Sequence, residues 1–160
     1  MSDQQHIEPV EIEAPPFIYI VPSVWKYDST DETTDIFTHR EGGELYVERL
    51  RFTSETQPGV MSDALTIMLG RLEDDDIGDD HSTPVLLSTG FAFISYTTKD
   101  VVDADFVRLF CELCGFESPR HLAVIRFSSS LHRDDLQRPD VTFNSHIIRQ
   151  YARMTRFAST

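Results

Sequence analysis

The sequence has few of the features that secretion or membrane insertion requires. Its 160 residues include only two cysteines, Cys111 and Cys114, too few for the disulfide framework of a small secreted domain. No apolar run approaches the roughly 18 residues of a membrane-spanning helix. The first residues are polar and acidic and do not resemble a signal peptide. We therefore expect a soluble, intracellular protein that does not act at a membrane.

Motifs that carry enzymatic chemistry are also missing. The sequence has no G-x-S-x-G nucleophile elbow, no glycine-rich phosphate loop and no H-E-x-x-H zinc motif. The carboxylates of residues 74–76 are adjacent, so they do not offer the two distinct environments that acid–base catalysis needs. The six histidines are scattered along the chain. These absences predict a protein that is not an enzyme and uses no cofactor.

Positive charge is scarce over most of the chain. The formal net charge is −13, and residues 1–117 carry 24 acidic against seven basic residues. Residues 118–160 carry seven arginines against three aspartates. An acidic body repels nucleic-acid phosphates and favours solubility. The same charge would suit an acidic inhibitor that imitates nucleic acid.

The composition predicts one domain with extensions at both ends. Residues 1–16 are acidic and end in Ala-Pro-Pro, which is typical of a flexible tail. We expect residues 17–128 to form a single α+β domain. Residues 129–160 should form a polar loop followed by a basic amphipathic helix.

Hydrophobic periodicity suggests the order of the elements. Apolar or alternating runs bounded by turn residues predict strands at 17–21, 44–52, 84–98 and 121–127, and the stretch 84–98 is either one strand or two strands that meet near residues 88–90. Apolar residues at helical spacing predict helices at 62–72 and 103–114, the second carried by Phe106, Leu109, Phe110 and Leu113. A terminal helix is expected at 145–157. Residues 28–35 (DSTDETTD) should be an acidic loop, because they have no apolar stripe.

One stretch, residues 89–96 (TGFAFISY), stands out. It is a glycine-led strand in which alternation places Phe91 and Phe93 on one face and Ala92, Ile94 and Tyr96 on the other. Two rings on an open sheet face form a platform on which a nucleobase or a partner's aromatic side chain can stack.

This stretch resembles the RNP1 strand of RNA-recognition motifs (RRM), with Thr89 where a basic residue normally stands. Residues 45–50 (LYVERL) resemble the RNP2 hexamer of the same family. The resemblance covers about residues 44–128. It implies a ferredoxin-like α+β sandwich, with a mainly antiparallel sheet, two helices on one face, and here the added C-terminal helix. It also implies stacking by Tyr46, Phe91 and Phe93, either on single-stranded RNA or, as in acidic members of the superfamily, on an aromatic anchor of a peptide.

The arginines of the expected C-terminal helix form a second candidate site. Arg149, Arg153 and Arg156 recur at i, i+4 and i+7, so they would make one basic stripe. Such a stripe can pair with the protein's own acidic surface, or it can contact an acidic partner or a nucleic-acid backbone.

The two cysteines have the C-x-x-C spacing of a zinc knuckle or a redox pair. Because they fall at the end of the expected helix 103–114 and not in a tight turn, we expect them to be structural and to bind no metal. Together these patterns favour a non-enzymatic protein-interaction module, a subunit or adaptor of a larger assembly with protein partners. RNA binding through the aromatic face and nucleic-acid mimicry are the alternatives.

Overall fold

The computed structural model describes residues 8–39, 43–53, 64–66, 68, 82–99, 105–135 and 138–158. In these residues, ten strands form two antiparallel sheets. The larger has seven strands in the order β3-β4-β5-β9-β8-β7-β6, and the smaller has the order β1-β2-β10. The strands are β1 Pro9–Ala14, β2 Phe17–Pro22, β3 Trp25–Thr30, β4 Thr34–His39, β5 Glu44–Thr53, β6 Val85–Leu86, β7 Ala92–Lys99, β8 Phe106–Ser118, β9 His121–His132 and β10 Arg156–Phe157.

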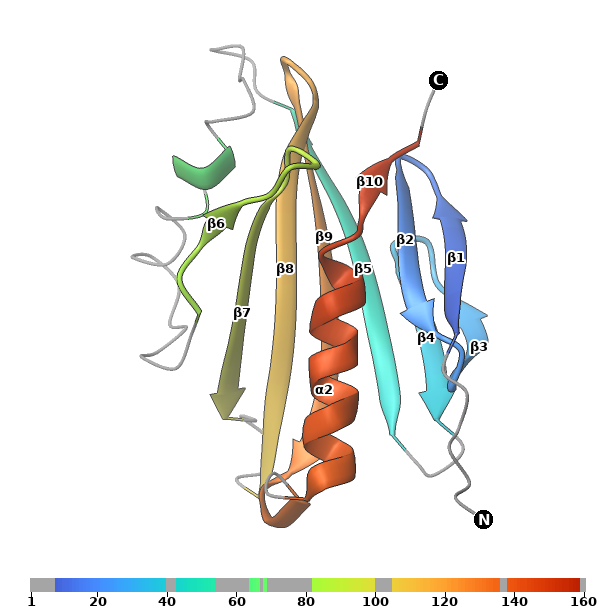
Figure 1. Cartoon of the computed structure of the whole chain (residues 1–160). Coiled ribbons are helices and arrows are strands. Elements are labelled where there is room, and N and C mark those ends of the chain that lie inside the picture. The colour runs from blue at the N-terminus through green and yellow to red at the C-terminus, as the bar shows by residue number, and fades with distance from the viewer. Residues whose placement is uncertain are drawn as a thin grey trace.

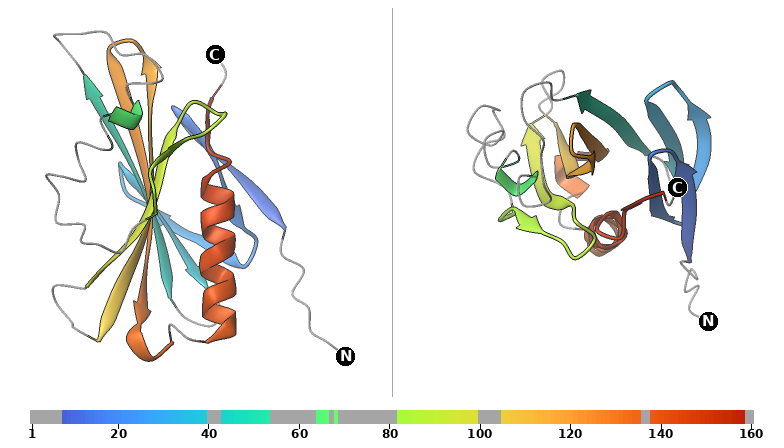
Figure 2. Two further views of the ribbon diagram at one scale, coloured as in Figure 1. Left: turned by 60° about the vertical axis from the view of Figure 1, so that its left-hand side comes forward. Right: turned by 90° about the horizontal axis from the view of Figure 1, so that it is seen from above.

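The large sheet forms the middle layer of the molecule. One face is covered by the small sheet and by helix α2, Pro139–Ala152, which runs alongside β8 and β9 (Figure 1). The helical residues 64–66 and 68 lie on the opposite face (Figure 2). A short 3-10 helix, η1 (Arg133–Asp135), links β9 to the region of α2. No helix of the described part is long and apolar enough to cross a membrane.

The main core lies between the large sheet, the small sheet and α2. Its largest fully buried members are aromatic: Phe17 and Tyr19 of β2, Phe37 of β4, Phe91 before β7 and Phe127 of β9. The Tyr19 ring meets those of Phe37 and Phe127 edge-on, at centroid distances of 6.4 and 5.6 Å. Burial of side chains of this size stabilises the fold by about 1.5–3 kcal/mol each, so this cluster ties the two sheets together.

A second, smaller core covers the other face of the large sheet. It joins Ala64 and Met68 of the helical segment to Ala92, Ile94 and Cys114 of β7 and β8. The thiol of Cys114 donates a hydrogen bond to the backbone oxygen of Ala64, with 3.4 Å between sulfur and oxygen. The central strands are therefore covered on both faces.

The predicted helix at 103–114 is wrong, because its residues from Phe106 onward belong to β8. Within β8 the side chains alternate, so that Leu109 and Leu113 face one side and Phe110 faces the other. A strand with two covered faces is apolar at successive positions and imitates helical spacing. Residues 103 and 104 lie outside the described part.

The ferredoxin-like fold is therefore also wrong, since the described chain is a mostly antiparallel two-sheet β-sandwich with few helices. The two expected helices do not pack on one face. Of the segment 62–72, residues 64–66 and 68 are helical and the others lie outside the described residues.

Several boundaries at the chain ends also differ from the expectation. Residues 9–14 form β1, which pairs along its whole length with β2, so this part of the expected tail is a strand. The last central strand continues to His132 instead of ending at residue 127. The terminal helix begins at Pro139 and ends at Ala152, and β10 follows it. The division of the chain into 17–128 and 129–160 stays a prediction.

Candidate functional site

The structure does not bring the three expected stacking rings together. Phe91 is 0% and Phe93 5% exposed, and the Phe91 ring lies 4.6 Å from the ring of Phe157, between centroids. The guanidinium carbon of Arg153 lies 5.5 Å from the Phe93 ring centroid. The predicted alternation is present, but Phe91 and Phe93 lie in the main core and Ala92, Ile94 and Tyr96 lie in the second core, so neither face is open. The proposed open platform is therefore wrong.

Tyr46 lies on the opposite face of the large sheet and is half-buried. Its hydroxyl donates to the carboxylate of Glu44, and the guanidinium carbon of Arg108 lies 5.5 Å from its ring centroid. The hydrogen bond to Glu44 raises the pKa of Tyr46. The tyrosine is thus held by its own neighbours, on a different surface from the two phenylalanines.

The three arginines do not form one helical stripe. Arg149 lies in the last turn of α2, Arg153 follows the helix as its C-cap, and Arg156 begins β10. Arg156 forms an ion pair with Glu11 of β1, with 2.9 Å between Nη2 and Oε1. This pair joins the two edge strands of the small sheet across the β2 strand between them.

The cysteines lie three residues apart on a strand, so Cys111 and Cys114 point to opposite faces of β8. This geometry prevents them from sharing one metal ion or forming a redox pair with each other. Burial raises the pKa of the Cys111 thiol to about 12. Among the described residues, no group of histidine, cysteine and acidic side chains is arranged to hold a metal.

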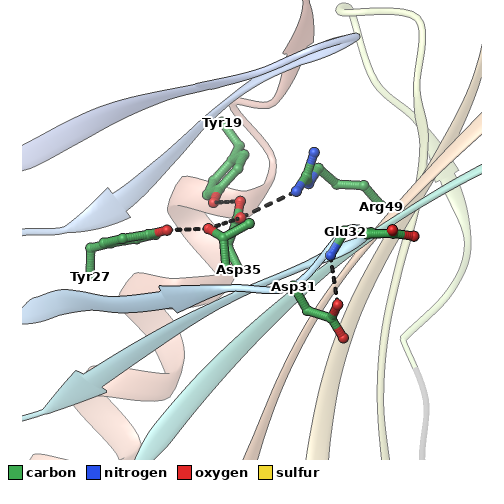
Figure 3. Close-up of polar contacts among 7 residues, drawn as sticks. Tyr19, Tyr27, Asp31, Glu32, Asp35 and Arg49 are labelled. Carbon is green, nitrogen blue, oxygen red and sulfur yellow. Dashed lines mark hydrogen bonds and ion pairs between the residues drawn. The ribbon is translucent and has the colours of Figure 1, made fainter.

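A buried polar network lies where the small sheet meets β3, β4 and β5 (Figure 3). Its centre is the carboxylate of Asp35, whose residue is 5% exposed. Three side chains donate to it: the Tyr19 hydroxyl at 2.6 Å, the Thr30 hydroxyl at 3.0 Å and Arg49 Nη2 at 3.2 Å. The Tyr27 hydroxyl extends the network through a contact with Thr30.

The electrostatics of this network favour a fixed structural role. Desolvation raises the pKa of the Tyr19 hydroxyl, and the hydrogen bond to Asp35 raises it further. Tyr19 is therefore a neutral donor at ordinary pH. A buried carboxylate is tolerated only when paired and hydrogen-bonded, and here donors from three other strands meet that need. The network holds the β3–β4 hairpin in a fixed position against β2 and β5.

The β3 strand and the turn that follows it form the longest unbroken run of exposed residues in the described chain. Every residue from Lys26 to Thr33 is exposed, and the Tyr27 side chain is exposed at 57%. The hairpin turns tightly at Asp31–Thr34, whose backbone groups exchange hydrogen bonds of 2.8 and 3.3 Å. We call residues 26–32 the β3 edge. It carries one ring and three carboxylates, those of Asp28, Asp31 and Glu32, against the single cation Lys26.

Sequence reasoning missed this site, because residues 28–35 were expected to be an irregular acidic loop. In the structure residues 28–30 and 34–35 belong to β3 and β4. The sequence does contain a signal for this hairpin. Two hydroxyl-bearing segments, Ser29-Thr30 and Thr33-Thr34, stand on either side of the acidic turn residues. Threonine favours strands and Asp favours turns.

No protein-family model and no curated protein sequence matches this chain. Solved structures with a similar fold do exist. The Ran-binding protein Mog1p of Saccharomyces cerevisiae matches with a TM-score of 0.55 at 10% identity, over 94% of this chain and 95% of Mog1p. LpqN of Mycobacterium tuberculosis, involved in cell envelope biogenesis, matches with a TM-score of 0.55 at 12% identity, over 96% of this chain and 92% of LpqN.

A protein from Bacteroides thetaiotaomicron matches with a TM-score of 0.54 at 10% identity, over 93% of this chain but only 48% of that protein. At these identities the likeness concerns the fold alone. The fold of this chain is thus similar to that of Mog1p and LpqN and is not that of an RNA-recognition motif.

Proposed function

We propose that this chain is a non-enzymatic protein-interaction module that works inside the cell as a subunit or adaptor of a larger assembly. The observation that carries this proposal is the β3 edge. It presents an exposed tyrosine ring among carboxylates, on a strand fixed by the Asp35 network, to which the Tyr27 hydroxyl is joined through Thr30. Interfaces are enriched in tyrosine, and a fixed surface loses little conformational entropy on binding.

The similarity to Mog1p supports the same class of function. Mog1p is a Ran-binding protein, and this chain shares its fold over nearly the whole length of both proteins. RNA binding through an aromatic sheet face has lost its basis, because Phe91 and Phe93 are in the core.

Quantitative affinity capture from the native source tests the proposal. The wild-type protein and two variants, Tyr27→Ala and Phe52→Ala, serve as baits. Phe52 is a matched control, because its ring is 52% exposed on β5 beyond the part of β5 that pairs with β4. We expect at least one protein to be recovered stoichiometrically with the wild type and with Phe52→Ala, and to be lost with Tyr27→Ala.

Two outcomes would contradict the proposal. Recovery of the same proteins with all three baits would remove the β3 edge from the interaction. Absence of any stoichiometric protein with the wild-type bait would count against an interaction module altogether.

A further inference from the structure

The β3 strand is an edge of the large sheet in the described chain, with β4 on one side. Its backbone groups alternate between the β4 ladder and the outside, and the register fixes which residues face outward. His39 donates to Gly43 across the β4–β5 ladder, so Phe37, two residues earlier and opposite Leu45, also directs its backbone groups toward β5. Tyr27, which pairs with Phe37 on the other side, therefore directs its own backbone groups outward.

The other end of β3 follows the same rule. Asp31, just beyond the end of β3, and Thr34, the first residue of β4, exchange backbone hydrogen bonds. Thr30, the residue before Asp31 and the last of β3, therefore directs its backbone groups outward. A β-bulge between Tyr27 and Ser29 separates the two outward positions. Unpaired donors and acceptors on an edge are a template for one more strand.

The side chains around these outward groups are mainly acidic. Asp28, Asp31 and Glu32 are exposed on the β3 edge itself. Glu8, which is also exposed, lies beside the β2–β3 turn, because its backbone amide and carbonyl both bond to Ser23, at 2.9 and 2.8 Å. The exposed Tyr27 ring adds a flat surface that a guanidinium or ammonium group can cover.

We propose that the β3 edge binds an extended, basic segment of a protein partner, which adds to the large sheet as a strand next to β3. This inference rests on the proposed function and specifies the chemistry of its partner. Backbone pairing with Tyr27 and Thr30 supplies the main-chain hydrogen bonds. Arginine or lysine side chains of the segment meet the carboxylates and the Tyr27 ring, which gives the preference for basic sequences.

Selection from a randomised nine-residue peptide library displayed on phage tests this proposal, with the wild-type protein as target. We expect the selected peptides to be enriched in arginine and lysine and depleted in proline. The best one is then synthesised with capped ends, together with a version in which alternate backbone amides are methylated and a version with glutamate in place of each basic residue. Both altered versions should bind at least about tenfold more weakly, because one loses main-chain donors and the other loses charge complementarity.

Hydrogen exchange locates the bound peptide on the protein. The amides of Tyr27 and Thr30 should become at least about tenfold more protected on binding, while those of Lys26 and Ser29, which face β4, should change little. The Tyr27→Ala variant should lose affinity, and Phe52→Ala should retain it.

The proposal is overturned if no peptide is enriched, if the enriched peptides are not basic, or if backbone methylation leaves the affinity unchanged. Each of these results is compatible with a capture experiment in which the Tyr27→Ala bait no longer recovers a native partner protein. In that case the interaction module would stand and the added strand would not.

Discussion

At the scale of single residues, Asp35 is the side chain on which the candidate site depends most. Its carboxylate accepts hydrogen bonds from Tyr19 and Thr30 and pairs with Arg49. Four strands are thus tied to one buried group. A surface ion pair would contribute little, but removal of one partner from a buried pair leaves the other uncompensated.

The variant Asp35→Ala should therefore lower the free energy of unfolding by about 3 kcal/mol, which is the lower end of the range for broken buried pairs because Arg49 keeps some solvent contact. Urea denaturation measures the loss. Asp35→Asn keeps an acceptor for Tyr19 and should lose less, while the exposed control Asp28→Ala should change stability by less than about 0.5 kcal/mol. Equal losses for the Ala and Asn variants would show that charge alone matters at this site.

Gly115 of β8 leaves room for the Phe91 ring. A Cβ atom at this position would stand 2.8 Å from Phe91 Cδ1 and 3.0 Å from Cε1. The ring cannot move away easily, because Phe17 and Phe157 contact it as well. Gly115→Ala should therefore cost about 1–3 kcal/mol.

A double-mutant cycle checks the cause of this loss. In a Phe91→Leu background the smaller side chain leaves space, so Gly115→Ala should cost less there than in the wild type. Additive losses would mean that the methyl group disturbs something other than Phe91.

Alkaline pH should destabilise the fold through buried neutral groups. Burial raises the pKa of Cys111 from its ordinary 9.0 to about 12, and that of Tyr19 is raised as well. A group whose pKa is higher in the folded than in the unfolded state contributes its full stabilisation at any pH below its unfolded-state pKa. This stabilisation is lost as the pH rises from the unfolded-state pKa to the folded-state pKa. For Cys111 the loss begins near pH 9 and proceeds to about pH 12, at up to about 1.4 kcal/mol per pH unit.

Urea midpoints measured between pH 8 and pH 11 should therefore fall with pH, and the fall should be shallower for Cys111→Val. The comparison concerns the slope, so a constant loss from the substitution itself does not matter. Identical slopes would show that the thiol is not buried in its neutral form.

At the scale of elements, the sequence predicts a strand best when one of its faces is polar. Residues 44–52 alternate, with Leu45 and Val47 on one face and Tyr46 and Glu48 on the other, and they form β5. Residues 106–118 are covered on both faces in the middle of the sheet, so their apolar residues fit a helix equally well. The prediction of β3 from sequence fails for the opposite reason, because five of its six residues are exposed and show no hydrophobic alternation.

The same limit applies to the candidate site. Alternation correctly separated Phe91 and Phe93 from Tyr96, but it cannot say whether a face of the strand is covered by other elements. The face of Phe91 is covered by Phe17 and Phe157, which come from the two ends of the described chain and pack against Phe91. Contacts between such distant segments leave no local pattern in the sequence.

The position of each strand in the large sheet should set its exchange rate. The β9 strand pairs with both β5 and β8, while β3 and β6 lie at the two edges of the described sheet. The amides of Ile125 and Phe127 should exchange only on global unfolding, and the amides of β3 that bond to β4 should exchange orders of magnitude faster by local opening. Hydrogen exchange followed by NMR tests this order, and equal protection of β3 and β9 would mean that the edge is covered in solution.

At the scale of the whole molecule, charge is divided between two groups of elements. The exposed acidic side chains of β1, β3 and the β3–β4 turn come from the first third of the chain, while α2 and β10 supply arginines. The Glu11–Arg156 pair joins the two groups across the small sheet. The β3 edge keeps its carboxylates on the outer surface, which is why the proposed partner is basic and not acidic.

The small sheet, α2 and the large sheet should unfold as one unit, because they share one core. Ile148 and Ala152 of α2 pack in the same cluster as Phe17 of β2 and Phe127 of β9. Loss of α2 would expose the inner faces of both sheets, so neither sheet should persist without it. We expect a single urea transition, with the same midpoint by far-ultraviolet circular dichroism and by fluorescence of Trp25, which is buried and is the only tryptophan of the chain.

Ala152→Asp sharpens this test, because it places an unpaired charge in the shared core and should lower both midpoints equally. The exposed neighbour Gln150 supplies the control, since Gln150→Ala removes a side chain of α2 outside the core and should leave both midpoints nearly unchanged. If the fluorescence of Trp25 instead followed an unchanged transition while the helical signal was lost early, α2 would be a separately folding extension, and the cooperative unit formed by the large sheet would end with β9 at His132.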